Sequence, residues 1–267
     1  SKSAIDSGEN GLPLAQVDHV HFFREDVASA ATPTWSSPVS FSGSIETSGN
    51  ITNFNQYYAT DGKDTHITGL YLGENATTTP TVSNNSVAFT INGDQDILYA
   101  AGINAGNRNN IAPSNTLNFK HKLTQFKFVA KTSSNIGAID GINVNIKNYN
   151  TTSSISLIDG QLGTWSVPAS DKNITLAAVA NGGDSTPSNG IMLEPNQKSI
   201  VLEVTAENYL TTAQTLTIQG KDGTSSDSFE AGKSYTITIT FTGQEVTATA
   251  TVSKWINGQD PESGVIK

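Results

Sequence analysis

The side chains that could carry out chemistry are few in this sequence, and they are not spaced as catalytic groups usually are. Its four histidines are His19, His21, His66 and His121, and it contains no cysteine. Only His19 and His21 have a suggestive spacing, because residues two apart lie on one face of a strand, but no third metal ligand accompanies them. The sequence therefore predicts no metal site, no disulfide and no thiolate nucleophile.

Motifs of nucleotide binding and covalent catalysis are also missing from the sequence. It contains no GxSxG, no SxxK and no glycine-rich phosphate loop. Asn92, Asp94 and Asp96 copy the first three ligand positions of a calcium loop, but Ile97 stands where that loop needs a glycine. A turn that leads into a strand is the better interpretation. We expect no cofactor and no enzymatic activity.

The composition indicates an all-β protein that does not bind nucleic acid. Threonine, serine, asparagine and β-branched residues are abundant, charged residues make up 15% of the 267 residues, and the formal net charge is -9. Phosphate backbones and anionic lipid surfaces attract clustered lysine and arginine, whereas Arg24 and Arg108 are the only arginines. The length suits two domains of ordinary size.

Alternating apolar residues mark the strands that must position any site, and the clearest case is residues 234–252. Gly243 and Gln244 suit a two-residue type II′ turn, which pairs Thr242 with Glu245. The register that follows places apolar residues opposite one another on one face. The expected pairs are Phe241 with Val246, Ile239 with Ala248, Ile237 with Ala250 and Tyr235 with Val252.

Shorter alternating runs elsewhere, separated by turn residues, extend this pattern to a β-sandwich. They are centred on Phe41, Phe89, Val144 and Leu202. Within residues 117–130 the apolar parity switches, which predicts a bulge. The polar stretch TSSNIG, near the middle of the chain, separates a predicted N-terminal domain (1–132) from a C-terminal domain (133–267).

Tryptophan offers one route to ligand binding. Trp35, Trp165 and Trp255 could stack on sugar rings if they were exposed, although tryptophan more often belongs to a core or its rim. A surface glycan-binding module is therefore an alternative function.

Several stretches, taken in order, resemble the fimbrillin family of the Bacteroides group, the subunits of type V pili. They are Asp96-Ile-Leu-Tyr-Ala100, LNFKHKLTQFKFVA (117–130), NVNIKNYNTTSSISLIDGQLGTW (143–165) and AGKSYTITITFTGQEVTATATVSKWINGQ (231–259). The resemblance implies two transthyretin-like Greek-key β-sandwich domains of about seven strands each. It also implies a lipoprotein of the cell surface, attached to the outer membrane by a lipidated cysteine that we expect to precede Ser1.

The resemblance further implies assembly by strand exchange with other pilin subunits, after an arginine-specific protease removes the first strand. The segment AQVDHVHFFR (15–24) has a strand-like apolar pattern and ends at Arg24. Cleavage after Arg24 would free this strand and leave a groove that a neighbouring subunit's strand can fill. The alternative is that Arg24 is a solvated residue at a strand end and is not cleaved.

Two further expectations concern the surface of the molecule. The tail after Trp255 contains Pro261 and Gly264 and is poorly suited to form a donor strand, which favours a tip or capping adhesin that contacts a host or bacterial surface ligand. Asp184-Ser185-Thr186 resembles the O-glycosylation signal of the same bacteria, so Ser185 is a candidate glycosylation site.

Overall fold

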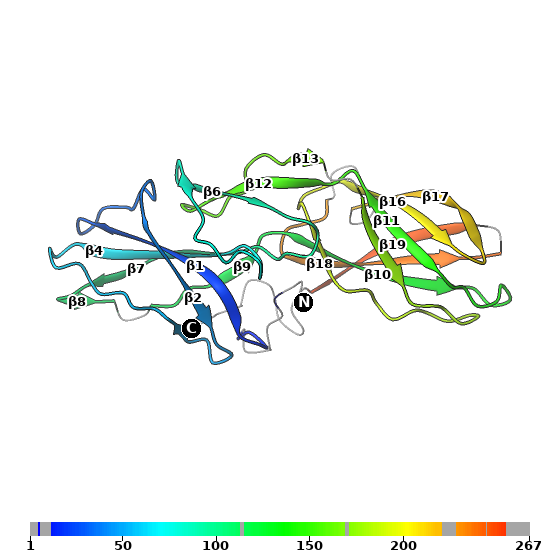
Figure 1. The fold of residues 1–267 in the computed structure, drawn as a ribbon, viewed down its shortest axis with the longest axis horizontal. Helices are drawn as coiled ribbons and strands as arrows, with labels where there is room; N and C mark the ends of the chain where they lie inside the picture. Colours follow the sequence, from blue (N-terminus) through cyan, green and yellow to red (C-terminus); the bar gives the residue numbers. More distant parts are fainter. Residues whose placement is uncertain are drawn as a thin grey trace.

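The computed structural model describes residues 5, 12–112, 115–168, 171–220, 228–243 and 245–254, and within them every regular element is a β-strand. The molecule is elongated, with strands β1, β2, β4 and β7 toward one end and β11, β16, β17 and β19 toward the other (Figure 1). The predicted all-β fold is confirmed. Over the same residues, no helix is long and apolar enough to cross a membrane.

The first β-sandwich contains a seven-stranded sheet with the order β3-β2-β1-β4-β7-β8, in which β9 also pairs with β7. Its strands are β1 (Val17–Val27), β2 (Val39–Ile45), β3 (Ile51–Thr52), β4 (Asp64–Tyr71), β7 (Leu98–Asn107), β8 (Asn110–Ile111) and β9 (Phe119–His121). The partner sheet has the order β13-β12-β6-β5. Its strands are β5 (Val82–Ser83), β6 (Ser86–Thr90), β12 (Asn150–Ser156) and β13 (Ser166–Pro168).

The second β-sandwich packs two four-stranded sheets against each other, with the orders β15-β10-β18-β19 and β14-β11-β16-β17. Their strands are β10 (Thr124–Thr132), β11 (Ile142–Lys147), β14 (Lys172–Leu176), β15 (Ile191–Leu193), β16 (Ser199–Ala206), β17 (Leu210–Gln219), β18 (Lys233–Phe241) and β19 (Val246–Lys254). Phe126 and Phe128 of one sheet share a continuous core with Val144 and Leu202 of the other.

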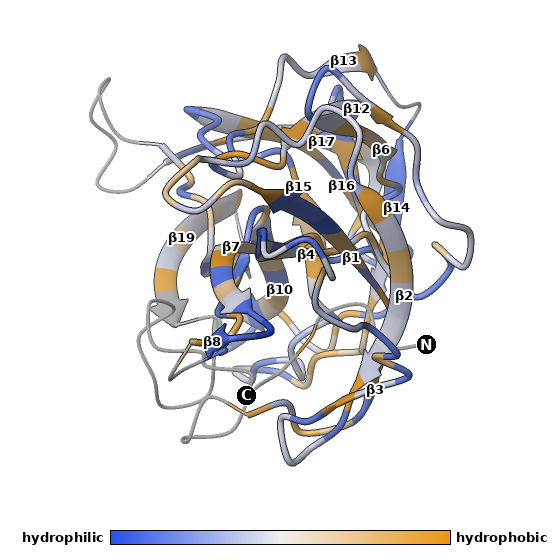
Figure 2. Cartoon of the chain, turned by 90° about the vertical axis from the view of Figure 1, so that its left-hand side faces the viewer, coloured by the Kyte–Doolittle hydropathy of each residue, from blue (hydrophilic) through white to orange (hydrophobic). Residues whose placement is uncertain are grey.

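The predicted hairpin is formed by β18 and β19, in the expected register. Phe241 pairs with Val246 and Tyr235 with Val252, with the two intermediate pairs as predicted. The alternation of hydrophobic and more polar residues is visible along β19 (Figure 2). The predicted turn type is wrong, because Gly243 does not adopt the positive φ that a type II′ turn requires.

The parity switch in residues 117–130 proved to be a break between two strands and not a bulge. Strand β9 pairs with β7 in the first sandwich, whereas β10 pairs with β15 and, in parallel, with β18 in the second. Leu123, in the short connection, is fully buried in the core of the first sandwich. The change of apolar face therefore marks the point at which the chain passes from one core to the other.

The strand pairing crosses the predicted domain boundary between residues 132 and 133 twice. Strand β10 precedes that boundary but belongs to the second sandwich, and β12 follows it but pairs with β6 of the first. The division into residues 1–132 and 133–267 therefore does not coincide with the sandwiches. We propose that the first folding unit ends near His121 and is completed by β12 and β13, which return to it from beyond β11.

The seven-stranded sheet buries apolar residues on both of its faces. Phe23 and Leu70 point into the core shared with β6 and β12. Phe22 and Ile67 point to the opposite face of the sheet, because successive residues of a strand alternate between faces. They belong to a second cluster on this outer face. In the described part of the chain, that outer cluster is covered by connecting segments that include Phe54 and Leu117, and not by another sheet.

Candidate functional site

Strand β1, which carries the predicted processing site, lies in the interior of the seven-stranded sheet. It pairs with β2 through residues 17–24 and with β4 through residues 21–27, so residues 21–24 have a partner strand on each side. Arg24 is opposite Val39 on β2 and Ile67 on β4. The strand extends to Val27, so the expectation that it ends at Arg24 is wrong: cleavage there would leave three residues of the strand in the sheet.

The central residues of β1 explain why this strand is interior. Val20, His21, Phe22 and Phe23 are consecutive and each is fully buried. A strand covered on one face alternates buried and exposed residues, whereas one covered on both faces reads as a continuous buried run. Burying Phe22 and Phe23 on opposite faces stabilises the fold by about 2 kcal/mol each. Loss of β1 would uncover both apolar clusters at once.

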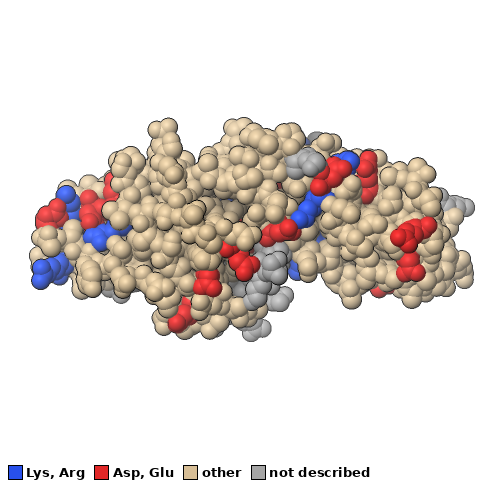
Figure 3. Space-filling model, viewed as in Figure 1, with Lys and Arg blue, Asp and Glu red and all other residues tan. Residues whose placement is uncertain are grey.

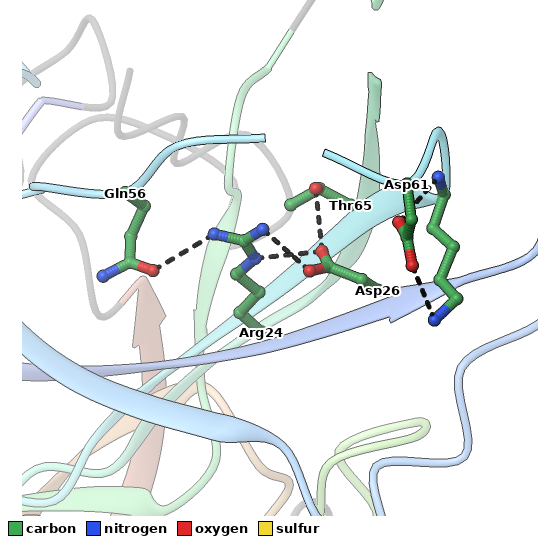
Figure 4. Close-up of polar contacts among 6 residues, drawn as sticks. Arg24, Asp26, Gln56, Asp61 and Thr65 are labelled. Atoms are coloured by element: carbon green, nitrogen blue, oxygen red, sulfur yellow. Dashed lines mark hydrogen bonds and ion pairs between the residues drawn. The ribbon is translucent and has the colours of Figure 1, made fainter. Parts of the chain in front are cut away.

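The Arg24 side chain is held against the outer face of the sheet by a bidentate ion pair (Figure 4). Its Nε donates to Asp26 Oδ1 at 2.9 Å, and its Nη2 donates to Asp26 Oδ2 at 2.7 Å. Thr65 Oγ1 also donates to Asp26 Oδ1, and Arg24 Nη1 points toward Gln56 Oε1 at 3.4 Å. The Arg24 side chain is only 11% exposed, so it is not the solvated strand-end residue of the alternative interpretation.

This geometry sets a condition for proteolysis at Arg24. Arg24 pairs with both β2 and β4 and Glu25 pairs with β4, so the Arg24–Glu25 peptide bond lies within a paired strand. A protease binds its substrate as a free extended segment. Cleavage after Arg24 stays a prediction. It requires that β1 leave the sheet, or that the protease act before the sheet closes.

Arg24 also lines a cavity of about 440 Å³ on the outer face of the sheet. The floor is formed by apolar residues of β4 and β7 and the walls by two connecting segments, which contribute polar and aromatic side chains. The lining residues are Arg24, Asn50, Ile51, Phe54, Gln56, Tyr57, Tyr58, Thr65, Ile67, Ile103, Ala105, Asn115 and Leu117. The sequence alone did not predict this cavity. The adjacent tyrosines of the NQYY stretch were the available signal, but nothing local places them against β4 and β7.

Ser185, the candidate glycosylation residue, is buried. Its Oγ accepts a hydrogen bond from the backbone N–H of Ala130 at 2.9 Å and donates to the carbonyl of Thr186 at 3.0 Å. Its own backbone N–H donates to the Ala130 carbonyl. The hydroxyl is therefore part of the pairing between this segment and β10, and glycosylation of Ser185 stays a prediction.

The tryptophans do not form an exposed sugar-stacking platform in the described residues. Trp35 is buried in the core of the first sandwich, close to the backbone of Gly102. Trp165 is half-buried and packs edge-on against Phe89. Trp255, like the tail that follows it, lies outside the described residues.

Two of the histidines, His21 and His121, and the aspartates of the calcium-loop-like stretch make structural contacts. The His21 ring nitrogens contact Ser42 Oγ at 3.1 Å and the Ala76 carbonyl at 2.8 Å. Asp94 forms an ion pair with Lys172, whereas Asp96 is buried beside His121. Among the described residues no three potential ligands converge on a metal position.

Charged side chains are sparse on the face of the molecule drawn in Figure 3, in keeping with the 15% of charged residues in the sequence. A sequence model described as fimbrillin-like matches residues 25–255. The chain belongs to the fimbrillin-like family. The predicted family membership is confirmed, and the match includes both sandwiches of this fimbrillin-like chain.

Solved structures resemble this fimbrillin-like chain in fold. A candidate cell adhesion protein from Bacteroides uniformis is 17% identical, with a TM-score of 0.60 and coverage of 90% of this chain and 91% of that one. One from Bacteroides ovatus is 19% identical, with a TM-score of 0.60 and coverage of 91% and 89%. Among curated proteins, none matches the sequence. At these identities the likeness concerns the fold.

Proposed function

We propose that this fimbrillin-like chain is a structural subunit of a bacterial surface pilus and assembles by strand exchange. The observation that supports this most directly is the position of β1, an interior strand with apolar residues buried on both faces. If β1 is removed, β2 and β4 each expose a row of unpaired backbone groups beside an apolar slot. A strand of matching pattern from another subunit can satisfy both the backbone groups and the slot.

In this proposal an arginine-specific protease cleaves after Arg24 when β1 is outside the sheet. Residues 25–27 then remain paired with β4 through Thr65 and its neighbours and keep one end of the slot formed. The incoming strand needs to replace only the part of β1 that contains Val20, Phe22 and Phe23.

The remaining features of the proposal concern the location of the protein, its role in the pilus and its modification. We propose a location at the cell surface, by attachment to the outer membrane through a lipid anchor or within the fimbria itself. A tip or capping role and the absence of catalysis belong to the same proposal. It is supported by the family match and by the similar structures, which are described as candidate cell adhesion proteins. Glycosylation of Ser185, if it occurs, is proposed to precede folding of its segment.

The experiment is digestion of the purified protein by an arginine-specific protease, followed by mass spectrometry and size-exclusion chromatography. The substitution Arg108→Lys should first remove the other arginine, which lies in the exposed turn between β7 and β8. In that background we expect loss of residues 1–24 and the appearance of oligomers. Asp26→Asn should speed the cleavage, because it removes the ion pair that holds Arg24 in place.

The matched controls are Arg24→Lys, which should abolish cleavage, and Asp61→Asn, which breaks the exposed pair with Lys63 and should leave the cleavage rate unchanged. A protein that is cut after Arg24 but keeps the cut segment bound, and stays monomeric with every candidate partner, would contradict assembly by this route.

The glycan-binding module proposed as the alternative function loses part of its basis, because Trp35 is buried and Trp165 packs on Phe89. A different feature, the cavity beside Arg24, bears on sugar binding and is independent of the tryptophans.

A further inference from the structure

The cavity beside Arg24 has the size and the mixed lining of a small-ligand site. Its volume of about 440 Å³ falls within the roughly 300–1,000 Å³ of typical ligand pockets, which combine apolar walls with a few polar groups. Ile67 and Ile103, which face each other across β4 and β7, form part of an apolar floor. Leu117 contributes to the wall from the segment that leads into β9.

The wall formed by residues 50–58 is held in place by its own contacts. The Tyr58 hydroxyl donates to the Ala105 carbonyl on β7 at 3.1 Å. Phe54 packs edge-on against both Phe22 and Phe41. Between these two anchors, Tyr57 lines the cavity while 84% of its surface is exposed. An aromatic ring left in water on an anchored segment is available to stack on a ligand.

Amide groups stand around the same cavity without partners in the described part of the chain. The side chains of Asn50 and Asn115 form no hydrogen bond to any described residue. Gln56 directs its Oε1 toward Arg24, which leaves its amide N–H groups available. Such groups can both donate and accept, so they suit hydroxyl groups, which do the same.

The electrostatics of the cavity favour an uncharged ligand. Among the described residues of the lining, Arg24 is the only charged one, and Asp26 neutralises it through a bidentate pair. The chain as a whole carries a formal net charge of -9, which repels anions. Arg24 still presents Nη1 toward Gln56, where it can donate a hydrogen bond to a neutral oxygen.

We propose that this cavity binds a neutral pyranose unit of a glycan. The apolar C–H face of the sugar packs on the Tyr57 ring and the isoleucine floor. Its hydroxyl groups bond to Asn50, Gln56 and Asn115 and to Arg24 Nη1. This proposal does not rest on strand exchange or on proteolysis, because the cavity exists with β1 in place.

The test is saturation-transfer-difference NMR of the intact chain with the methyl glycosides of glucose, galactose, mannose and N-acetylglucosamine, with 1-hexanol as an apolar probe. We expect at least one glycoside to receive saturation. Tyr57→Ala should weaken its binding roughly tenfold and Tyr57→Phe should restore it, because the ring and not the hydroxyl makes the stacking contact. Gln56→Ala should weaken binding severalfold.

The control is Ile158→Ala, which truncates an exposed apolar residue outside the cavity and should leave binding unchanged. Circular dichroism verifies that each variant is folded. Four results would overturn the proposal: no glycoside binds, binding is insensitive to Tyr57→Ala, 1-hexanol competes fully with every glycoside, or Tyr57→Ala abolishes a concentration-dependent dimer. The last would assign the cavity to a second copy of this chain.

Discussion

At the scale of single residues, the polar groups of β1 show that a buried strand tolerates charge only when each group has a partner. Arg24 is held by Asp26 through two hydrogen bonds, and Asp26 also accepts one from Thr65. His21, which is fully buried, has a contact for each ring nitrogen. Burial lowers the pKa of His21, although the hydrogen bond to the Ala76 carbonyl acts in the opposite direction and nearby His19 adds to the lowering.

This shift predicts that the free energy of unfolding falls as the pH drops below 6.5, the ordinary histidine value. The unfolded chain takes up a proton there before the folded protein does, so stability is lost until the lower folded pKa is reached. His21→Gln should therefore show a smaller loss of stability between pH 7 and about pH 5 than the wild type. Urea titrations at both pH values measure the difference.

The pKa of His66 is also lowered mainly by burial. His66 contributes equally to the pH dependence of stability in the wild type and in His21→Gln, so its contribution cancels when the two proteins are compared. Equal pH slopes for the wild type and His21→Gln would refute the assignment.

At the scale of elements, the seven-stranded sheet depends on a close approach between β4 and β9. Gly69 of β4 lies opposite Phe22 of β1 and Ala100 of β7. A Cβ atom at this position would lie 2.5 Å from the ring of Phe119. The glycine lets the buried Phe119 ring cover β4 and close part of the outer cluster.

Gly69→Ala should consequently destabilise the protein by about 1–3 kcal/mol, the usual cost of overpacking. Phe119→Leu in the same chain should recover part of that loss, because the smaller side chain makes room for the new methyl group. Urea denaturation of the two single variants and the double variant measures the coupling.

The matched control is Gly243→Ala, where a Cβ atom would meet, among the described residues, only Ile136, at an ordinary 3.7 Å. This variant should be nearly neutral. A neutral or stabilising Gly69→Ala would show that Phe119 moves freely and that the contact does not hold the sheet.

At the scale of the whole molecule, the two sandwiches are tied together by strands that cross between them. Ile155 of β12 is fully buried and pairs with Val87 of β6. Met192, which adjoins β10 of the second sandwich, also belongs to the core of the first. The first sandwich is therefore incomplete without residues from the second half of the chain.

A fragment of residues 1–132 should for this reason lack a cooperative unfolding transition, because it leaves an edge of β6 unpaired and removes Ile155 from the first core. The intact chain should unfold cooperatively. Thermal and urea denaturation followed by circular dichroism distinguish the two, and two-dimensional NMR reports on packing. A fragment with a dispersed spectrum and a sharp transition would contradict this description of the folding unit.

The sequence alone determined those features that depend on local periodicity. Alternating apolar residues and the spacing around Gly243 and Gln244 were sufficient to predict the β18–β19 register. A slip by one residue would turn every apolar side chain to the other face, and the length of the loop selects among the remaining registers. The motif order was sufficient for the family. Composition determined the net negative charge, which does not depend on how the chain folds.

Only the tertiary structure decided which strands share a sheet and where the site lies. Residues 117–130 change apolar face because they pass between two cores, and the same pattern would describe a bulge. Arg24 is an interior strand residue with a bidentate partner, and its position in the sequence gave no sign of β2 and β4 beside it. The cavity brings together Tyr57, Ile103 and Asn115 because long-range pairing aligns β1, β4 and β7. Local sequence patterns do not predict which distant strands pair, so they could not predict the cavity.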